Sequence, residues 1–177
     1  MQVLEAANKV DDQPRAAYYA APANYEFWRA GLLEEIHATC YFPRQFTWRK
    51  KDGSPIASMG GENGIIPPDY LYRTVALPLN VLCEMMVKRL EGQPTAEIRW
   101  RSKVSAVGQS EGKAWVELEG KERFEADYVV GCDGGNSVVR KELFGGEFPG
   151  FTWDEQIVAT NVRILPAITA ELGNCFG

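Results

Sequence analysis

The stretch ADYVVGCDGGNSVVRKELFGG, residues 126–146, carries the clearest fold signal in the chain. Residues 128–132 are a short run of apolar, strand-forming residues, long enough for a buried strand of a parallel sheet and too short for a helix. The segment DGGNS, residues 133–137, follows, and its two glycines permit positive φ and close backbone approach, while its Asn and Ser can cap a helix. That helix is predicted over residues 138–144, and Gly145 would end it. The pattern indicates a strand, a glycine-rich turn and a helix.

A turn of this kind suits a phosphate or a polyol. The end of a strand, the glycines and the beginning of a helix bring unpaired backbone N–H groups and the positive end of the helix dipole to one point. Asp133 lies in the turn and can accept hydrogen bonds from a hydroxyl group. On pattern alone, an ordinary connection in an α/β sheet explains the Asp-Gly-Gly sequence equally well.

Residues 131–140, GCDGGNSVVR, resemble the G-x-D-G-x-x-S-x-x-R segment of the FAD-dependent aromatic monooxygenases, the para-hydroxybenzoate hydroxylase-like flavoproteins. The resemblance implies that Asp133, Gly134 and Gly135 lie near the ribityl and pyrophosphate groups of FAD. It also implies NADPH or NADH as a second cofactor, but only if flavin is bound. It covers nearly the whole chain and only the middle portion of the family, without the N-terminal G-x-G-x-x-G segment and the C-terminal half.

Two further residues match cofactor contacts that the resemblance implies. Glu5 ends a short apolar run like the second strand of a Rossmann-type unit, where the family glutamate holds the adenosine ribose of FAD. Arg15 lies in a polar, proline-punctuated loop over residues 8–23 and matches the family arginine that reaches the flavin. The arginine or glutamine that the family places near the beginning of its next helix is not found within residues 75–80, and Arg73 would replace it if the register is shifted. A surface glutamate and a solvated arginine are the alternative interpretations of Glu5 and Arg15.

Composition limits the class of protein. A length of 177 residues favours one domain, and the 45% hydrophobic and 24% charged content is typical of a soluble globular protein. A net charge of -5 and the lack of a basic cluster argue against nucleic acid or an anionic membrane surface as partner. No apolar run approaches the roughly 20 residues of a transmembrane helix, and the N-terminus lacks a signal-type pattern. We therefore expect a cytoplasmic location.

Metal binding is not expected. The four cysteines, at positions 40, 83, 132 and 175, are scattered and lack the close pairs of a zinc site. The single histidine, His37, cannot complete such a site. Each cysteine is expected to be a thiol in a reducing compartment.

The remaining elements are predicted from apolar periodicity and turn residues. Residues 24–39 form an amphipathic helix that Gly31 interrupts, and residues 79–90 form a second helix with one apolar face. Aromatic residues that alternate with polar ones within residues 41–68 predict a hairpin or a strand pair, and another alternating strand begins at residues 156–164. Short alternating segments between the second helix and residue 128 predict a three-stranded antiparallel meander; these segments are 96–100, 103–107, 114–118 and 123–126.

The predicted fold class is α/β, or mixed α+β. It is a remnant of a Rossmann-like FAD-binding domain with an antiparallel β-meander and the beginning of a substrate-domain sheet. We expect residues 1–177 to form a single compact domain, with residues 1–40 and 70–146 resembling the FAD domain and residues 41–69 and 147–177 resembling the substrate domain. A Rossmann sheet without its first strand exposes a parallel edge, so a homodimer through that edge is expected.

Three functions fit these observations. The first is a truncated homologue of an FAD-dependent monooxygenase of phenolic or polyketide-like compounds, unable to hydroxylate alone. The second is a flavin-independent acid–base enzyme, a cyclase, isomerase, dehydratase or lyase, acting on a small aromatic or polyketide-like molecule. The third is a non-catalytic binding module. The acid–base enzyme needs one group that titrates near neutral pH and a cation or phenol that steadies an enolate. The candidates for these roles are His37, Asp69, Tyr70 and Arg73, with Glu62 and Asp133 as further carboxylates.

Overall fold

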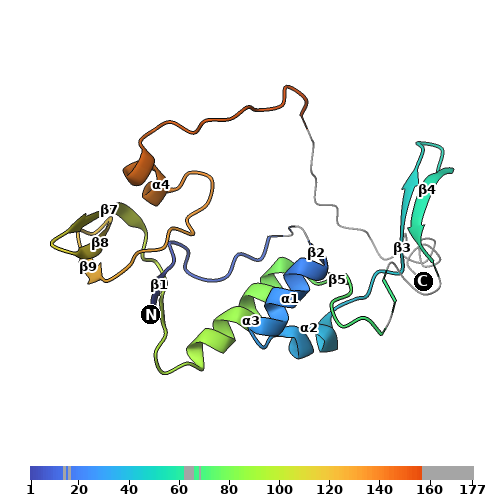
Figure 1. The fold of residues 1–177 in the computed structure, drawn as a ribbon, viewed down its shortest axis with the longest axis horizontal. Helices are drawn as coiled ribbons and strands as arrows, with labels where there is room; N and C mark the ends of the chain where they lie inside the picture. Colours follow the sequence, from blue (N-terminus) through green and yellow to red (C-terminus); the bar gives the residue numbers. More distant parts are fainter. Residues whose placement is uncertain (14, 16, 62–65, 68, 157–177) are drawn as a thin grey trace. The chain divides into compact units, whose positions relative to one another are not determined.

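The structure is a computed structural model, and it describes residues 1–13, 15, 17–61, 66–67 and 69–156 of the chain (Figure 1). The chain divides into two units, Met1–Gly145 and Gly146–Gly177. All helices and strands of the described residues lie in the first unit. The strand predicted to begin at residue 156 falls almost entirely outside the described residues.

The first unit has a mixed α/β fold, as the sequence predicts. Its helices are α1 (Ala21–Arg29), α2 (Leu33–Thr39), α3 (Leu79–Glu91) and α4 (Val138–Phe144). Its strands are β1 (Gln2–Leu4), β2 (Tyr18–Tyr19), β3 (Gln45–Arg49), β4 (Pro55–Gly60), β5 (Val75–Ala76), β6 (Glu97–Arg99), β7 (Val104–Ser110), β8 (Lys113–Leu118) and β9 (Arg123–Ala126).

The break between α1 and α2 is caused by Gly31. Its φ of +69° is a conformation that residues with a side chain rarely adopt, and a Cβ atom there would lie 2.5 Å from Nη2 of Arg89. The chain turns at this glycine, and Leu32 begins the apolar face of α2. The predicted interruption of the helix is confirmed, although α1 begins earlier, at Ala21, with Pro22 in its first turn.

The main hydrophobic core joins α2, β5 and α3. Every third or fourth residue of the two helices is apolar, so one face of each packs inward. The buried members are Leu32, Ile36, Val75, Leu77, Leu82 and Met85. Aromatic side chains from β2, α1 and the chain after α2 cover this core, so these segments are fixed relative to one another; they are Tyr19, Phe27 and Phe42.

The strands form four small sheets. β1 and β6 pair in parallel, with Val3 opposite Ile98, and β2 pairs with β5 in the antiparallel sense. β3 and β4 form the predicted hairpin, and β7, β8 and β9 form the predicted antiparallel meander. The segment 96–100, also predicted as part of the meander, contains β6 and pairs with β1 instead. The parallel pair is the arrangement that a Rossmann-type unit requires at the end of β1.

Residues 128–132 are not a strand in the structure, contrary to the prediction. The ladder between β8 and β9 ends at Ala126, and no backbone hydrogen bond joins residues 128–132 to any other described segment. A strand exists only when a neighbouring strand supplies hydrogen-bond partners, and here none of the described strands does so. The side chains are exposed as a result, Tyr128 to 87% and Val130 to 81%.

Candidate functional site

Glu5 lies where β1 ends, at the carboxyl end of a parallel strand. Its backbone N–H donates to the carbonyl of Arg99 at 2.9 Å, and its own carbonyl accepts from the N–H of Ser102 at 2.8 Å. The carboxylate oxygen Oε1 accepts a hydrogen bond from the N–H of Ala7 at 2.7 Å, while Oε2 makes no hydrogen bond to another described residue. A fixed backbone and an available carboxylate oxygen fit the binding of a ribose hydroxyl.

Arg15 lies in a mostly polar segment between β1 and β2. Its guanidinium forms an ion pair with Asp11, and both side chains are well exposed. Its charge also reaches Cys83 on α3, where it opposes the effect of burial, which raises the pKa of that thiol. An exposed ion pair contributes little to stability, so Arg15 can exchange Asp11 for an anionic ligand at small cost.

Asp133 is held as a helix cap. Its Oδ1 accepts from the hydroxyl of Ser137 at 2.5 Å, and its Oδ2 accepts from the N–H groups of Val138 and Val139 at 2.6 and 3.3 Å. Ser137 Oγ in turn accepts from the N–H of Arg140 at 3.0 Å. These bonds, that from Ser137 foremost, lower the pKa of the Asp133 carboxyl. The first N–H groups of α4 are therefore satisfied by the protein itself, and a ligand would meet the turn rather than the end of the helix.

The glycines after Asp133 leave open space beside the backbone. Gly134 has φ +77°, and no atom lies within 4 Å of the position that its Cβ would occupy. The same space beside Gly135 is empty of neighbouring described atoms. A glycine is therefore needed at position 134 because of the positive φ, not because a side chain would clash with a neighbour. The open space at both positions fits close approach of a polyol or phosphate.

His37 and Arg73 meet on the ring of Phe42. Cζ of Arg73 lies 3.5 Å from the centroid of this ring, and the ring of His37 lies 5.2 Å from it in an edge-to-face arrangement. Burial, and secondarily the Arg73 charge, lower the pKa of His37, whose Nε2 is buried without a hydrogen-bond partner among the described residues. The structure therefore brings together two of the four acid–base candidates.

Asn24 fixes the backbone at Arg73. Its side chain is fully buried, and Nδ2 donates to three carbonyls, those of Tyr19 at 2.9 Å, Ala20 at 3.1 Å and Arg73 at 3.1 Å. The amide thus ties β2, the beginning of α1 and the segment before β5 together. The sequence pattern predicts Asn24 at the start of a helix and gives no sign that this polar residue is buried, so its role is visible only in the structure.

The side chains of the other two acid–base candidates do not join this pair on Phe42, although the carbonyl of Tyr70 accepts from the N–H of Arg73 at 3.3 Å. Tyr70 is half exposed and its ring packs on Tyr72 at 6.0 Å, in an aromatic cluster that also includes Tyr25 and Trp28 of α1. Asp69 is exposed. Glu62 lies outside the described residues.

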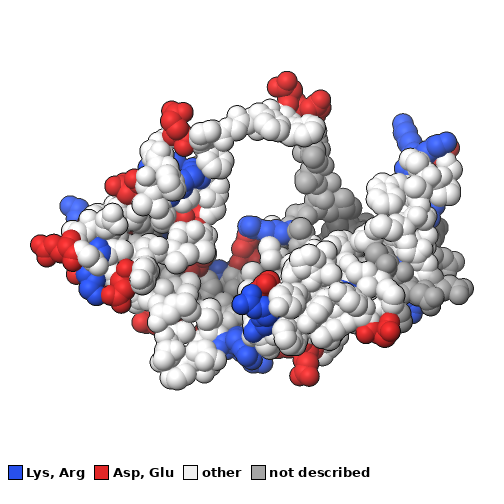
Figure 2. Space-filling model, viewed as in Figure 1, with Lys and Arg blue, Asp and Glu red and all other residues white. Residues whose placement is uncertain are grey.

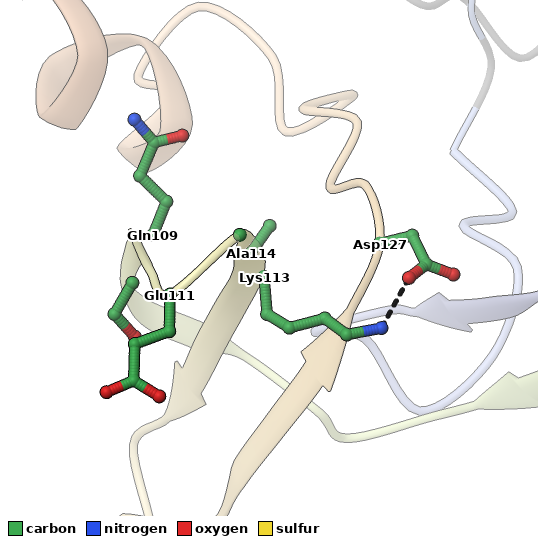
Figure 3. A pocket seen from close by; sticks show the side chains of 7 residues that line it. Gln109, Glu111, Lys113, Ala114 and Asp127 are labelled. Carbon is green, nitrogen blue, oxygen red and sulfur yellow. Dashed lines mark hydrogen bonds and ion pairs between the residues drawn. The ribbon is translucent and has the colours of Figure 1, made fainter.

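A shallow pocket of about 450 Å³ lies at the turn between β7 and β8 (Figure 3). It is lined by the turn itself and by Lys113, whose Nζ forms an ion pair with Asp127. None of the candidate residues lines it, and its one basic side chain is already paired with Asp127, so we do not place the site there.

Acidic and basic side chains are interspersed on the face of the molecule shown in Figure 2, between wide areas of uncharged residues. No three His, Cys, Asp or Glu side chains among the described residues are grouped so as to hold a metal ion. None of the helices in the described ranges has the length and apolar character that crossing a membrane requires.

Comparison with known proteins gives a consistent result. A family model described as an FAD binding domain matches residues 2–171. Para-nitrophenol 4-monooxygenase of Pseudomonas sp. is 34% identical over 90% of this chain and 40% of its own length. The 6-hydroxy-3-succinoylpyridine 3-monooxygenase of Pseudomonas putida is 30% identical over 91% of this chain and 42% of its own length. The chain therefore spans about two fifths of the length of these relatives.

The fold is also found in solved structures. The crystal structure of p-nitrophenol 4-monooxygenase from Pseudomonas putida superimposes with a TM-score of 0.75 at 31% identity, over 86% of this chain and 39% of that one. A flavin-dependent monooxygenase solved with FAD and substrate gives a TM-score of 0.67 at 17% identity, which supports the fold alone.

Proposed function

This chain belongs to the FAD binding domain family, and from that premise we propose that it is part of an FAD-dependent monooxygenase that acts on phenolic or polyketide-like compounds. The observation that carries the proposal is the family match over residues 2–171, together with Glu5 at the carboxyl end of a parallel strand. The names of the relatives, a nitrophenol and a hydroxypyridine monooxygenase, support a small hydroxylated aromatic substrate.

The residues that would hold FAD are Glu5, Arg15, Asp133, Gly134 and Gly135. The available Oε2 of Glu5 would bind a ribose hydroxyl, and Arg15 would meet a negative group of the cofactor. Asp133 would act through its cap, which fixes the shape of the turn, while the open glycine backbone would approach the ribityl or phosphate groups. When bound, FAD would supply the redox chemistry, accepting hydride from NADH or NADPH and using oxygen to hydroxylate the ring.

We further propose that residues 1–177 do not hydroxylate by themselves. The relatives are more than twice as long, and a monooxygenase must both bind the flavin on all sides and exclude water from it. The flavin-free acid–base enzyme and the binding module of the sequence analysis gain no support from the relatives.

Fluorescence titration with FAD tests the first proposal. Saturable binding is expected, weakened by about tenfold in Glu5→Gln, because a charge-assisted hydrogen bond to ribose is worth about 1.5 kcal/mol. Glu34→Gln, which changes an exposed glutamate of α2, is the matched control and should bind FAD like the parent chain. Binding that Glu5→Gln leaves unchanged would remove Glu5 from the site, and no binding by the parent chain would contradict the proposal that these residues hold FAD.

A product assay tests the second proposal. The chain is incubated with FAD, NADH and 4-nitrophenol, and hydroxylated product is sought by chromatography. No product is expected, and its formation by residues 1–177 alone would show that the proposed incompetence is wrong.

A further inference from the structure

The Phe42 ring carries a cation on its face and a histidine at its edge. Arg73 Cζ lies 3.5 Å from the ring centroid, which places the guanidinium against the ring. Stacking of this kind satisfies the flat face of a guanidinium and leaves its in-plane N–H donors available. Among the described residues, no carboxylate or carbonyl accepts a hydrogen bond from the Arg73 side chain, whereas Arg15, Arg29, Arg99 and Arg123 are each paired with an acid.

Among the described residues, no acidic side chain forms an ion pair with Arg73. The charge that shifts the pKa of both His37 and Cys40 is that of Arg73. The carboxylates on the same helix as His37, Glu34 and Glu35, are exposed, and Glu35 lies 3.9 Å from Lys88 of α3. A half-buried cation without a counter-ion attracts an anion more strongly than a solvated one, because it is less screened.

The position of the guanidinium is fixed before any ligand arrives. Asn24 holds the carbonyl of Arg73, and the N–H of Arg73 donates to the carbonyl of Tyr70 at 3.3 Å. The Phe42 ring, which packs on the main core, holds the other end of the side chain. A fixed side chain loses little conformational entropy when it binds, which favours affinity.

We propose that Arg73, stacked on Phe42 beside His37, binds the anionic oxygen of an aromatic ligand, a phenolate or a carboxylate. The guanidinium donates to the ligand oxygen. The buried Nε2 of His37, whose ring contacts the edge of Phe42, is a second polar group beside it. This proposal rests on the proposed function, since it names the group by which the aromatic substrate is recognised. His37 is a positioning residue here.

The single histidine of the chain provides the test. The proton NMR signal of the His37 ring carbon between the two nitrogens is followed against pH with and without benzoate, a probe that stays ionised throughout the range in which histidine titrates. Bound benzoate offsets the Arg73 charge, so the titration midpoint of His37 should move upward. Benzamide, which has the same shape and no charge, should leave the midpoint unchanged.

Variants assign the effect to the guanidinium. In Arg73→Gln the midpoint should lie higher without any ligand and should no longer respond to benzoate, whose affinity should fall at least about tenfold. Arg73→Lys keeps the charge and loses the planar fork, so it should retain the response with weaker affinity. Arg29→Gln, at an exposed arginine of α1 paired with Glu26, is the control and should behave like the parent chain.

Three results would overturn the proposal. They are a midpoint in the parent chain that benzoate does not move, an equal response to benzamide, and a response that survives in Arg73→Gln. The FAD titration is independent of this experiment, so FAD binding without a benzoate response would contradict the Arg73 site and leave the proposed function standing. A benzoate response without FAD binding would support the Arg73 site and contradict the proposal that this chain holds FAD.

Discussion

Replacement of Asn24 by alanine should lower the stability of the first unit substantially. Asn24 is 0% exposed, and among the described residues its Nδ2 is the only side-chain donor to the carbonyls of Tyr19, Ala20 and Arg73, of which that of Ala20 also accepts from the backbone N–H groups of Ala23 and Asn24. Each such hydrogen bond contributes about 1 kcal/mol net, and a buried carbonyl left without a donor costs at least as much. Asn24 Oδ1 is itself buried without a partner, and its removal offsets part of the loss.

The expected loss for Asn24→Ala is therefore about 2 kcal/mol, which corresponds to about 4–8 °C in melting temperature for a chain of this size. Asn24→Asp gives a sharper comparison because it preserves the volume and replaces the amide donor by oxygens that face three carbonyl oxygens. It should lose at least twice as much as the alanine variant, because a buried acid without a donor nearby adds a desolvation penalty. Urea unfolding followed by circular dichroism measures both variants.

Asn8→Ala changes an exposed asparagine of the loop after β1 and should stay within about 0.5 kcal/mol of the parent chain. The reasoning is refuted if Asn24→Ala also stays within about 0.5 kcal/mol, or if Asn24→Asp is no less stable than Asn24→Ala. The first outcome would mean that water replaces the amide at no cost. The second would mean that volume, and not hydrogen bonding, fixes this position.

Three further predictions concern α4, its turn and His37. Gly134→Ala should destabilise by about 1 kcal/mol in thermal unfolding because its φ is +77°, whereas Gly135→Ala, where no positive φ is found and space is open, should be nearly neutral. Ser137→Ala removes the cap of α4 and should speed amide hydrogen exchange in that helix, with a loss of about 1 kcal/mol; unchanged exchange would contradict the cap. The pKa of His37 in the folded chain lies below its ordinary value of 6.5 because of burial and the Arg73 charge. As the pH falls below 6.5, the unfolded chain therefore binds the proton first and the free energy of unfolding decreases. In His37→Gln this dependence of the unfolding free energy on pH just below 6.5 should disappear.

Local patterns predicted the elements that depend on neighbours in sequence. The apolar face of residues 79–90, the hairpin within residues 41–68 and the meander that ends at residue 126 are all confirmed, because turn residues and periodicity determine such elements. Glu111 and Gly112, both at positive φ, make the turn between β7 and β8. The break at Gly31 is confirmed for the same reason.

Contacts between distant segments could not be predicted in this way. The parallel pairing of β1 with β6 joins segments at opposite sides of three helices in sequence, and no short pattern encodes a partner. The run at residues 128–132 has the composition of a strand, but a strand also requires a neighbour, which composition does not reveal. The meeting of His37 with Arg73 on Phe42 depends on the packing of α2 against β5, which follows from the whole core.

The capping of α4 lies between these cases. The sequence indicated Ser137 or Asn136 as the cap, and Ser137 is confirmed. The carboxylate of Asp133 was assigned to a ligand hydroxyl, whereas the structure shows both of its oxygens bound within the turn. An aspartate in such a glycine-rich turn can either bind a ligand hydroxyl or cap the following helix. Only the geometry of the turn distinguishes these two roles.

The uncovered segment at residues 128–132 has a consequence for how the protein behaves in a test tube. It combines uncharged, apolar side chains with backbone groups that no described strand pairs, which is the composition of segments that nucleate fibrils. Turbidity that grows with concentration while the circular dichroism spectrum stays native would therefore arise at this segment and not from loss of the core. Val130→Lys, which places a charge on its most central side chain, should keep the protein clear at concentrations where the parent chain clouds.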